Sequence, residues 1–364
     1  MTLFLTLVLY LIFIGTISCL MMNLSGNKGK NKVFVLTCAT ICGLLAAFRG
    51  TTGSDSAMYI AAFCNGSESV FRWQEFEIGF VVLINILKQM GASYHMMFFV
   101  MAFFSAYCVF SAIAHERSYI DTSVASLIYA SDLYFFGLNG MRQHLAVCLC
   151  LYAFVLFFDK KYMRTLLLIV IAILFHKSAL MCLVIYMTFV IYKSKYKKMI
   201  FSIVVVILLL LVANRELMGK MVYIITKSSY YASYITRDAE TGTTIFKYYV
   251  KCIPIAIMPL LCFEDIEKNN KMLIFILFMY MGIILSSLGA VTATQVSRLG
   301  MYFSNMKIFV LGYCAKRSLP IKSGVLVSST FNRKMICAYF LLMFYYSYFY
   351  RGFSHLVPYG QSLR

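Results

Sequence analysis

Long runs of apolar residues, separated by short polar linkers, follow one another along the whole chain. The stretch "FSIVVVILLLLVAN" (201–214), for example, contains no charged residue. A helix needs about 17–25 mainly apolar residues to cross a bilayer, and only helices and closed β-barrels do so. The runs here are continuous rather than alternating. The pattern therefore predicts an all-α, polytopic membrane helix bundle.

We expect about twelve transmembrane helices in a single integral membrane domain, residues 1–364. The expected spans are about 2–22, 33–48, 95–114, 121–138, 141–158, 163–176, 177–192, 198–214, 245–263, 272–290, 299–315 and 334–350. The first span lacks the features of a cleavable signal peptide and is read as a retained helix.

One apolar stretch, residues 77–91, is not expected to span. It is short, and Asn85 and Lys88 interrupt it. Its apolar residues share one helical face, which predicts an amphipathic helix at the membrane surface. These residues are Phe80, Leu83, Ile84 and Leu87.

Composition agrees with a membrane protein. The chain is 62% hydrophobic and 13% charged, whereas about 25% of residues are charged in soluble domains. A net charge of +19 is explained by basic cytoplasmic linkers rather than by nucleic-acid binding. The 12 cysteines show no C-x-x-C motif and no Cys/His spacing, so no metal site is predicted.

The positions of the basic linkers predict the topology, because cytoplasmic loops are rich in Lys and Arg. These residues are Lys28, Lys30, Lys32, Lys160, Lys161, Arg164, Lys193, Lys195, Lys197, Lys198, Lys316, Arg317, Lys322, Arg333 and Lys334. If these linkers are cytoplasmic, the number of crossings between them makes 49–94 an outer loop that carries the amphipathic helix. It also makes 215–244 a second outer loop. It also requires 163–192 to be a hairpin whose turn lies at 175–178, below the outer surface.

Unusual polar residues fall on the outer side of this topology, where they predict an outward-facing polar cavity. Arg49, Arg142 and Arg298 each adjoin the outer end of a span. Arginine forks match phosphate geometry, so three of them suit a diphosphate group. The alternative is that each arginine anchors a helix end by snorkelling.

Asp55, Glu77 and His176 are the candidate bases on the same side. A glycosyl or acyl acceptor hydroxyl must lose a proton, and a carboxylate or an imidazole commonly accepts it. A turn histidine also serves simply to bond backbone carbonyls, and this alternative stays open. The sequence shows no Walker A motif and no D-x-D motif, so neither a nucleotide nor another cofactor is implied.

Six short motifs are spread over residues 49–359: "RGTTGSDSAMY", "FEIGF", "GLNGMRQHLA", "ILFHKSAL", "SRLGMYF" and "VPY". Together these motifs resemble those of the bacterial O-antigen and exopolysaccharide polymerases, the Wzy-like and EpsG-like proteins. Many relatives have a proline after the glutamate, where this chain has Ile78. The resemblance carries the site over to Arg49, Asp55, Arg142, His176 and Arg298, with the supporting positions Gly53, Tyr59, Gln143 and Tyr302.

The resemblance implies a multi-pass polymerase of the bacterial cytoplasmic membrane, with its active site facing the exterior. Such an enzyme moves a growing glycan from undecaprenyl diphosphate to the non-reducing end of another lipid-linked repeat unit. A chain-length regulator is a further possible partner. The rival functions are a flippase for lipid-linked sugar, an O-antigen ligase and a membrane O-acyltransferase. A flippase would be favoured by inverted internal repeats, which the sequence does not show.

Overall fold

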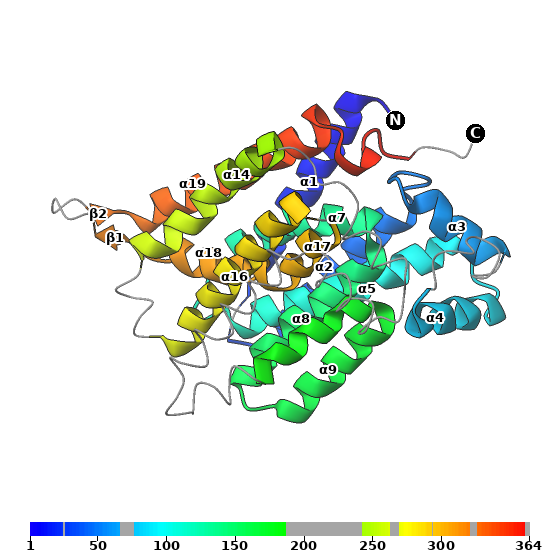
Figure 1. Cartoon of the computed structure of the whole chain (residues 1–364), viewed down its shortest axis with the longest axis horizontal. Helices are drawn as coiled ribbons and strands as arrows, with labels where there is room; N and C mark the ends of the chain where they lie inside the picture. Colours follow the sequence, from blue (N-terminus) through cyan, green and yellow to red (C-terminus); the bar gives the residue numbers. More distant parts are fainter. Residues whose placement is uncertain are drawn as a thin grey trace.

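The computed structural model describes residues 1–24, 26–65, 76–186, 242–262, 269–292, 294–320 and 326–360, and within these it is almost entirely helical (Figure 1). The first half contains α1 (Leu3–Met22), α2 (Lys28–Ala47), α3 (Ser56–Asn65), α4 (Ile78–Gln89), α5 (Tyr94–His115), α6 (Thr122–Ile128), η1 (Tyr129–Leu133), α7 (Tyr134–Asn139), α8 (Met141–Phe158), α9 (Tyr162–Phe175) and η2 (Lys177–Leu183). The second half contains α14 (Gly242–Leu261), α16 (Asn270–Thr292), α17 (Thr294–Ser304), α18 (Lys307–Ala315), β1 (Leu319–Pro320), β2 (Leu326–Val327), α19 (Ser329–Phe344), η3 (Tyr345–Tyr350) and η4 (Phe353–His355).

Five of the described helices are long and apolar enough to cross a membrane, by length and composition, and all five coincide with expected spans. They are α1, α2, α5, α8 and the Asn270–Ser287 part of α16. Outside the described residues lie the span expected at 198–214, the last six residues of that expected at 177–192, and most of the outer loop 215–244. The multi-pass helical architecture is confirmed, and the number of twelve spans stays a prediction.

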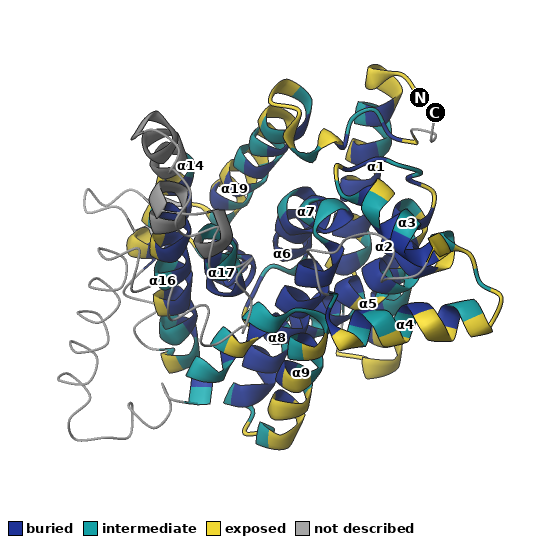
Figure 2. Cartoon of the chain, turned by 45° about the vertical axis from the view of Figure 1, so that its right-hand side comes forward, coloured by how far each residue is buried: buried dark blue, intermediate teal, exposed yellow. Residues whose placement is uncertain are grey.

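The helix α8 forms the centre of the described bundle. Of the residues of α8, 89% are buried, whereas only 33% are buried in the apolar part of α1, which exposes Leu3, Phe4 and Ile12. A helix that is apolar on every face and buried on every face belongs to the interior, whereas one with an exposed apolar stripe is suited to lipid contact. Figure 2 shows α8 mostly dark blue among its neighbours. The candidate site residues at the start of α8 are therefore held by a core helix.

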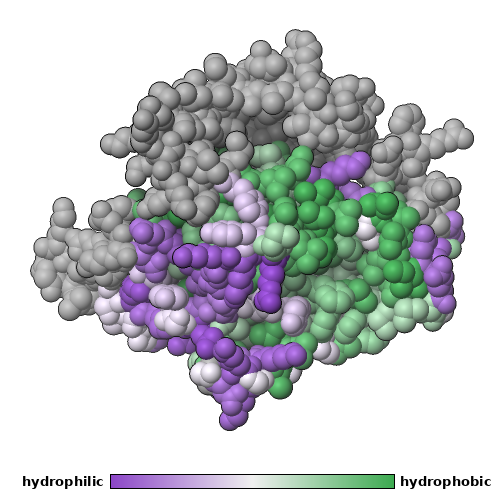
Figure 3. Space-filling model, turned by 90° about the horizontal axis from the view of Figure 1, so that it is seen from below, coloured by the Kyte–Doolittle hydropathy of each residue, from purple (hydrophilic) through white to green (hydrophobic). Residues whose placement is uncertain are grey.

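Charged side chains collect at one end of the bundle, which we call the basic end. His115 at the end of α5 pairs with Asp159 at the end of α8, 2.6 Å apart. Lys271 at the start of α16 contacts Glu116, 2.5 Å away. Figure 3 shows hydrophilic residues gathered on one part of the visible face, beside a broad hydrophobic area. That this end faces the cytoplasm, as the charge pattern of the linkers suggests, stays a prediction.

The predicted hairpin is confirmed over its described part. The helix α9 ends at Phe175, and His176 has an extended backbone (φ −159°, ψ 113°). The chain then turns back, so that the Tyr186 hydroxyl donates to the Tyr162 carbonyl, 2.8 Å away. Tyr162 begins α9 at the basic end. The chain has therefore returned to that end by Tyr186, ten residues after His176. His176 thus lies at a helix break and not within a straight helix.

A helix, α4, is present where the amphipathic stretch was predicted, and its place at the membrane surface stays a prediction. Its residues Phe80, Ile84 and Leu87 are buried, while Val82 and Ile86 are exposed. Glycine is needed at position 79, because a Cβ there would lie 2.8 Å from the Leu174 carbonyl oxygen. This close approach seats the start of α4 on the end of α9, beside the His176 turn.

Two expected spans contain π-helical segments. The segment η1 lies between α6 and α7 in the span predicted at 121–138, and η3 follows α19 in the span predicted at 334–350. The span predicted at 299–315 is interrupted between α17 and α18 at Asn305 and Met306. π-helical segments inside α-helices often accompany functional sites, and interruptions of this kind are tolerated at membrane depth only where protein or water covers them.

Candidate active site

Three residues from three separate motifs meet at the end of the bundle opposite the basic end, which we call the site end. Glu77 Oε1 accepts a hydrogen bond from His176 Nδ1 at 2.9 Å. Glu77 Oε2 accepts from the Arg142 guanidinium. The Glu77 side chain is 2% exposed, so both contacts are shielded from solvent. We call Glu77, Arg142 and His176 the Glu77 cluster.

Local structure explains why each member points inward. Glu77 is the N-cap residue of α4, but its side chain makes no cap hydrogen bond and is free to reach across to the other two. Arg142 stands in the first turn of α8, and His176 is held by the break that ends α9. The backbone N–H of Lys177 adds a longer contact to Glu77 Oε1, at 3.4 Å.

The electrostatics keep Glu77 ionised. Burial raises the pKa of its carboxyl, but the hydrogen bond from His176 and the charge of Arg142 outweigh burial and lower the pKa to about 2. A carboxylate has no hydrogen to donate, so Nδ1 of His176 must carry the hydrogen of their shared bond. The Nε2 of a neutral His176 imidazole is then the nitrogen that accepts a proton.

Aromatic side chains enclose the Arg142 guanidinium. Its Cζ lies 4.8 Å from the ring centroid of Phe76, 5.7 Å from that of Phe80 and 6.0 Å from that of Tyr59. Cation–π contacts of this kind strengthen when water is excluded. Burial raises the pKa of Tyr59, against the opposing charge of Arg142. Phe76 belongs to the "FEIGF" motif but was not singled out from the sequence.

The helix α17 brings two more predicted positions beside the cluster. The Gln143 side-chain amide donates to the backbone carbonyl of Arg298 at 2.9 Å. One turn later, the Tyr302 hydroxyl lies 2.9 Å from the hydroxyl of Ser178, two residues after His176. The Arg298 side chain is half-buried. Ser178 was missed in the sequence, although it lies in the quoted "ILFHKSAL".

Arg49 belongs to a neighbouring set of contacts, the Arg49 loop (residues 49–55). Its guanidinium donates to the Leu138 carbonyl and lies 3.9 Å from the ring centroid of Phe98. Arg49 is 1% exposed, and its Nε and Nη2 have no hydrogen-bond partner among the described residues. Burial lowers the pKa of Arg49 to about 10, so it stays charged at neutral pH. Its contacts are thus distinct from those of Arg142.

The rest of the Arg49 loop is fixed by backbone contacts. The backbone N–H of Asp55 and the hydroxyl of Ser54 both donate to Asn139 Oδ1, at 2.9 Å in each case. Gly53 has φ +104°, a conformation that side chains disfavour, and its N–H donates to the His355 carbonyl at 3.1 Å. The closing "VPY" motif joins in, because the Tyr359 hydroxyl donates to the Leu45 carbonyl at 2.7 Å.

The structure thus brings together Tyr59, Glu77, Arg142, Gln143, His176, Tyr302 and the backbone of Arg298, with Arg49, Gly53 and Asp55 in the adjoining loop. Convergence of the three guanidinium groups on one anion, and an outward-facing polar cavity, stay predictions. Among the described residues, no three His, Cys, Asp or Glu side chains come together in a way that could hold a metal ion.

Comparison with known proteins decides the family. A family model described as the EpsG family matches residues 32–360, nearly the whole chain. The chain belongs to the EpsG family. Searches of curated proteins and of solved structures found no match.

EpsG proteins are a family of Wzy-like polysaccharide polymerases, so the resemblance seen in the motifs is confirmed. This EpsG-family chain is a multi-pass membrane protein of the polysaccharide-polymerase type. The matched range includes every motif on which the resemblance rested, from Arg49 to Tyr359, and all three members of the Glu77 cluster.

Proposed function

We propose that the protein is a polysaccharide polymerase that uses a lipid diphosphate-linked donor. It transfers the growing glycan from undecaprenyl diphosphate to the non-reducing end of a second lipid-linked repeat unit. The active site faces the exterior of the cytoplasmic membrane. The observation that carries this proposal is the Glu77 cluster, which joins three motifs of the family in one buried contact set.

The reaction requires a base for the acceptor. The acceptor hydroxyl oxygen forms a bond to the anomeric carbon of the donor, and the bond from that carbon to the diphosphate oxygen breaks. The hydroxyl proton goes to Nε2 of His176, the nitrogen that the bond to Glu77 leaves as acceptor. Glu77 orients the imidazole and stabilises the imidazolium that forms, as the third group does in catalytic triads.

The leaving lipid diphosphate requires positive charge. Arg142 stands at the N-terminus of α8, where the helix dipole also favours anions. A guanidinium has five N–H donors in a planar fork, so pairing with Glu77 is compatible with a phosphate partner. Arg298 and Arg49 are the further cations assigned to this group, Asp55 is a second acidic candidate, and Gly53, Tyr59, Gln143 and Tyr302 support the site.

The test uses purified protein and purified lipid-linked repeat units, with the products separated by length. A ladder of long products supports a polymerase. A single transfer to core lipid would instead indicate a ligase, transfer of an acyl group an acyltransferase, and chemically unchanged lipid a flippase. Any of the last three results overturns the proposal. A ladder that disappears in His176→Ala and persists in a variant at the basic end assigns the reaction to the Glu77 cluster.

A further inference from the structure

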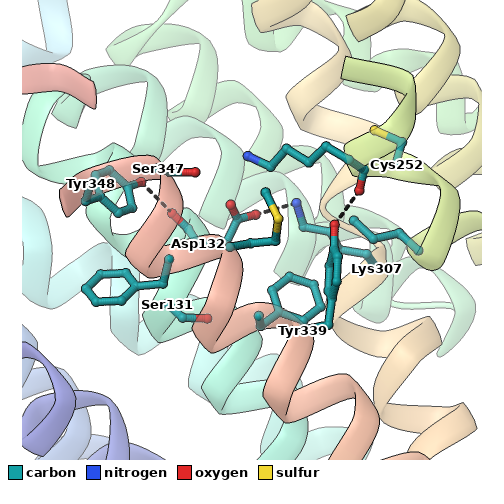
Figure 4. A pocket seen from close by; sticks show the side chains of 12 residues that line it. Ser131, Asp132, Cys252, Lys307, Tyr339, Ser347 and Tyr348 are labelled. Atoms are coloured by element: carbon teal, nitrogen blue, oxygen red, sulfur yellow. Dashed lines mark hydrogen bonds and ion pairs between the residues drawn. The ribbon is translucent and has the colours of Figure 1, made fainter. Parts of the chain in front are cut away.

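A second polar site lies within the bundle, away from the Glu77 cluster. It is a cavity of about 100 Å³ between η1, α14, α18, α19 and η3. Its polar lining consists of Ser131, Asp132, Lys251, Lys307, Tyr339, Ser347 and Tyr348. In Figure 4 the Asp132 carboxylate and the Lys307 ammonium point toward each other across its middle. We call it the Asp132 pocket.

The pocket lies at an intermediate depth in the membrane. Asp132 comes ten residues after Thr122, at the basic end, and seven before Asn139, at the site end. At a helical rise of 1.5 Å per residue, these separations are roughly 15 Å and roughly 10 Å. The Asp132 side chain is nevertheless 33% exposed and that of Lys307 is 14% exposed. Charged groups at this depth are costly against lipid, so the cavity requires water or a polar ligand.

The charges of the lining are unequal. Asp132 forms an ion pair with Lys307, which neutralises both. Lys251 lines the same cavity, and its positive charge also acts on Asp132, although no ion pair of its side chain with a described residue is seen. Among the described lining residues, one carboxylate and two ammonium groups give a net charge of +1. A buried charge is stable when it has an opposite partner, so the pocket is complementary to a single negative charge.

Two tyrosine hydroxyl groups at the cavity wall bond backbone carbonyls. The Tyr348 hydroxyl donates to the Asp132 carbonyl at 3.4 Å, and the Tyr339 hydroxyl donates to the Lys251 carbonyl. These bonds orient both tyrosines at the cavity wall. Both π-helical segments of the described chain, η1 and η3, contribute residues to this wall. π-helical segments recur at functional sites, where the extra residue redirects side chains.

We propose that the Asp132 pocket binds one oxyanion group, such as a phosphoryl group, between Lys251 and Lys307. A cavity of about 150 Å³ accommodates benzene, so one of about 100 Å³ holds a single oxyanion and not a whole sugar ring. Lysine serves as a point charge for phosphate, and the Asp132 carboxylate keeps Lys307 in place. The group comes from a free anion or from a membrane lipid. This site is independent of the reaction proposed for the Glu77 cluster.

The experiment measures ligand-dependent stability of the full chain in nanodiscs of phosphatidylcholine. Inorganic phosphate is titrated against chloride at equal ionic strength, and the midpoint of thermal unfolding is followed. We expect a saturable rise with phosphate. Lys251→Met should weaken the apparent affinity about tenfold or more, the loss of one charge-assisted hydrogen bond. Lys334→Met, which removes an exposed lysine of α19, should leave it unchanged.

A second experiment distinguishes a lipid oxyanion from a free one, and a further variant should strengthen anion binding instead of weakening it. If the oxyanion belongs to a lipid, phosphatidylglycerol in the nanodisc should raise the midpoint while free phosphate does not, again through Lys251.

Asp132→Asn raises the net charge of the pocket and should tighten binding several-fold. The proposal is overturned if neither anion stabilises the protein beyond its control, or if Lys251→Met and Asp132→Asn both bind as the unaltered chain does.

Discussion

The Glu77 cluster and the Asp132 pocket both contain a carboxylate paired with a cation, yet their surroundings differ. Glu77 is 2% exposed and bonds both Arg142 and His176. Asp132 is 33% exposed and pairs with Lys307 beside a cavity. A carboxylate with several donors in a dry site is held rigidly, whereas one beside open space leaves room for a ligand.

The difference indicates a division of roles. The Glu77 cluster is preorganised, which suits groups that must be aligned when a bond is made or broken. The Asp132 pocket has unequal charges, which suits the binding of an anion. The comparison is tested by substitutions at the Glu77 cluster that separate chemistry from stability.

The largest effect is expected for His176. Replacing it with Ala removes the proposed proton acceptor, and loss of a general base costs about 10²–10⁴-fold in rate. The measurement is the rate of ladder formation by purified protein at equal amounts. His115→Gln is the matched control, because His115 pairs with Asp159 at the basic end and should keep its activity. A rate reduced less than tenfold in His176→Ala would exclude it as the base.

The next largest effect is expected for Arg142. Arg142→Ala should reduce turnover by one to two decades, because a charge-assisted contact is worth about 1.5–3 kcal/mol. It should also destabilise the protein by about 3–5 kcal/mol, since it leaves the buried Glu77 carboxylate without its cation. Arg142→Lys should restore charge but not the fork, and so rescue only in part. Arg351→Ala, which removes an exposed arginine of the site end, is the control.

A double variant separates the two consequences of losing Arg142. Glu77→Gln combined with Arg142→Met removes both charges, so most of the lost stability should return. Activity should not return if Arg142 holds the leaving diphosphate. Thermal unfolding and ladder formation are measured on the same preparations. Recovery of activity along with stability would show that Arg142 serves only to pair with Glu77.

Much of this architecture could be predicted from the sequence. The apolar runs identified the five long helices, and the positive charge at both flanks of 163–192 required the turn at His176. Glu77 contacts Arg142 and His176 although Ile78, and not a proline, follows it. The bond between Glu77 and Arg142 was not predicted, because it joins residues 65 positions apart. Pairings of this kind depend on how helices pack, which periodicity does not specify.

The Asp132 pocket was missed although a signal was present. Asp132, Lys251 and Lys307 each lie inside an expected span, at 121–138, 245–263 and 299–315. Ionisable residues within spans are functional candidates by default. These three residues lie within their spans, whereas the candidate site residues lie at or beyond the ends of spans. Their convergence required the packing of α14 and α18 around η1, which no single stretch of sequence records.

A smaller effect is expected when Glu77 is titrated. Its pKa is lowered in the folded protein from an ordinary value of 4.5 to about 2, so its contribution to stability is fully present above pH 4.5. The contribution is lost as the pH falls from about 4.5 toward about 2, and amounts to on the order of 3 kcal/mol. The unaltered protein should therefore lose more stability over this window than Glu77→Gln, measured by thermal unfolding. Parallel pH profiles would contradict the strong ion pairing assigned to Glu77.

The smallest effect on turnover is expected at Cys64, which tests whether the site end faces outward. Cys64 is exposed at the end of α3, whereas most of the described cysteines are buried among apolar side chains. An impermeant thiol reagent should label it in intact cells and leave turnover within about twofold, because its side chain lies outside the Glu77 cluster. Cys64→Ser should abolish the labelling. Labelling that requires permeabilised cells would reverse the orientation of the bundle, and an outward-facing active site would then be excluded.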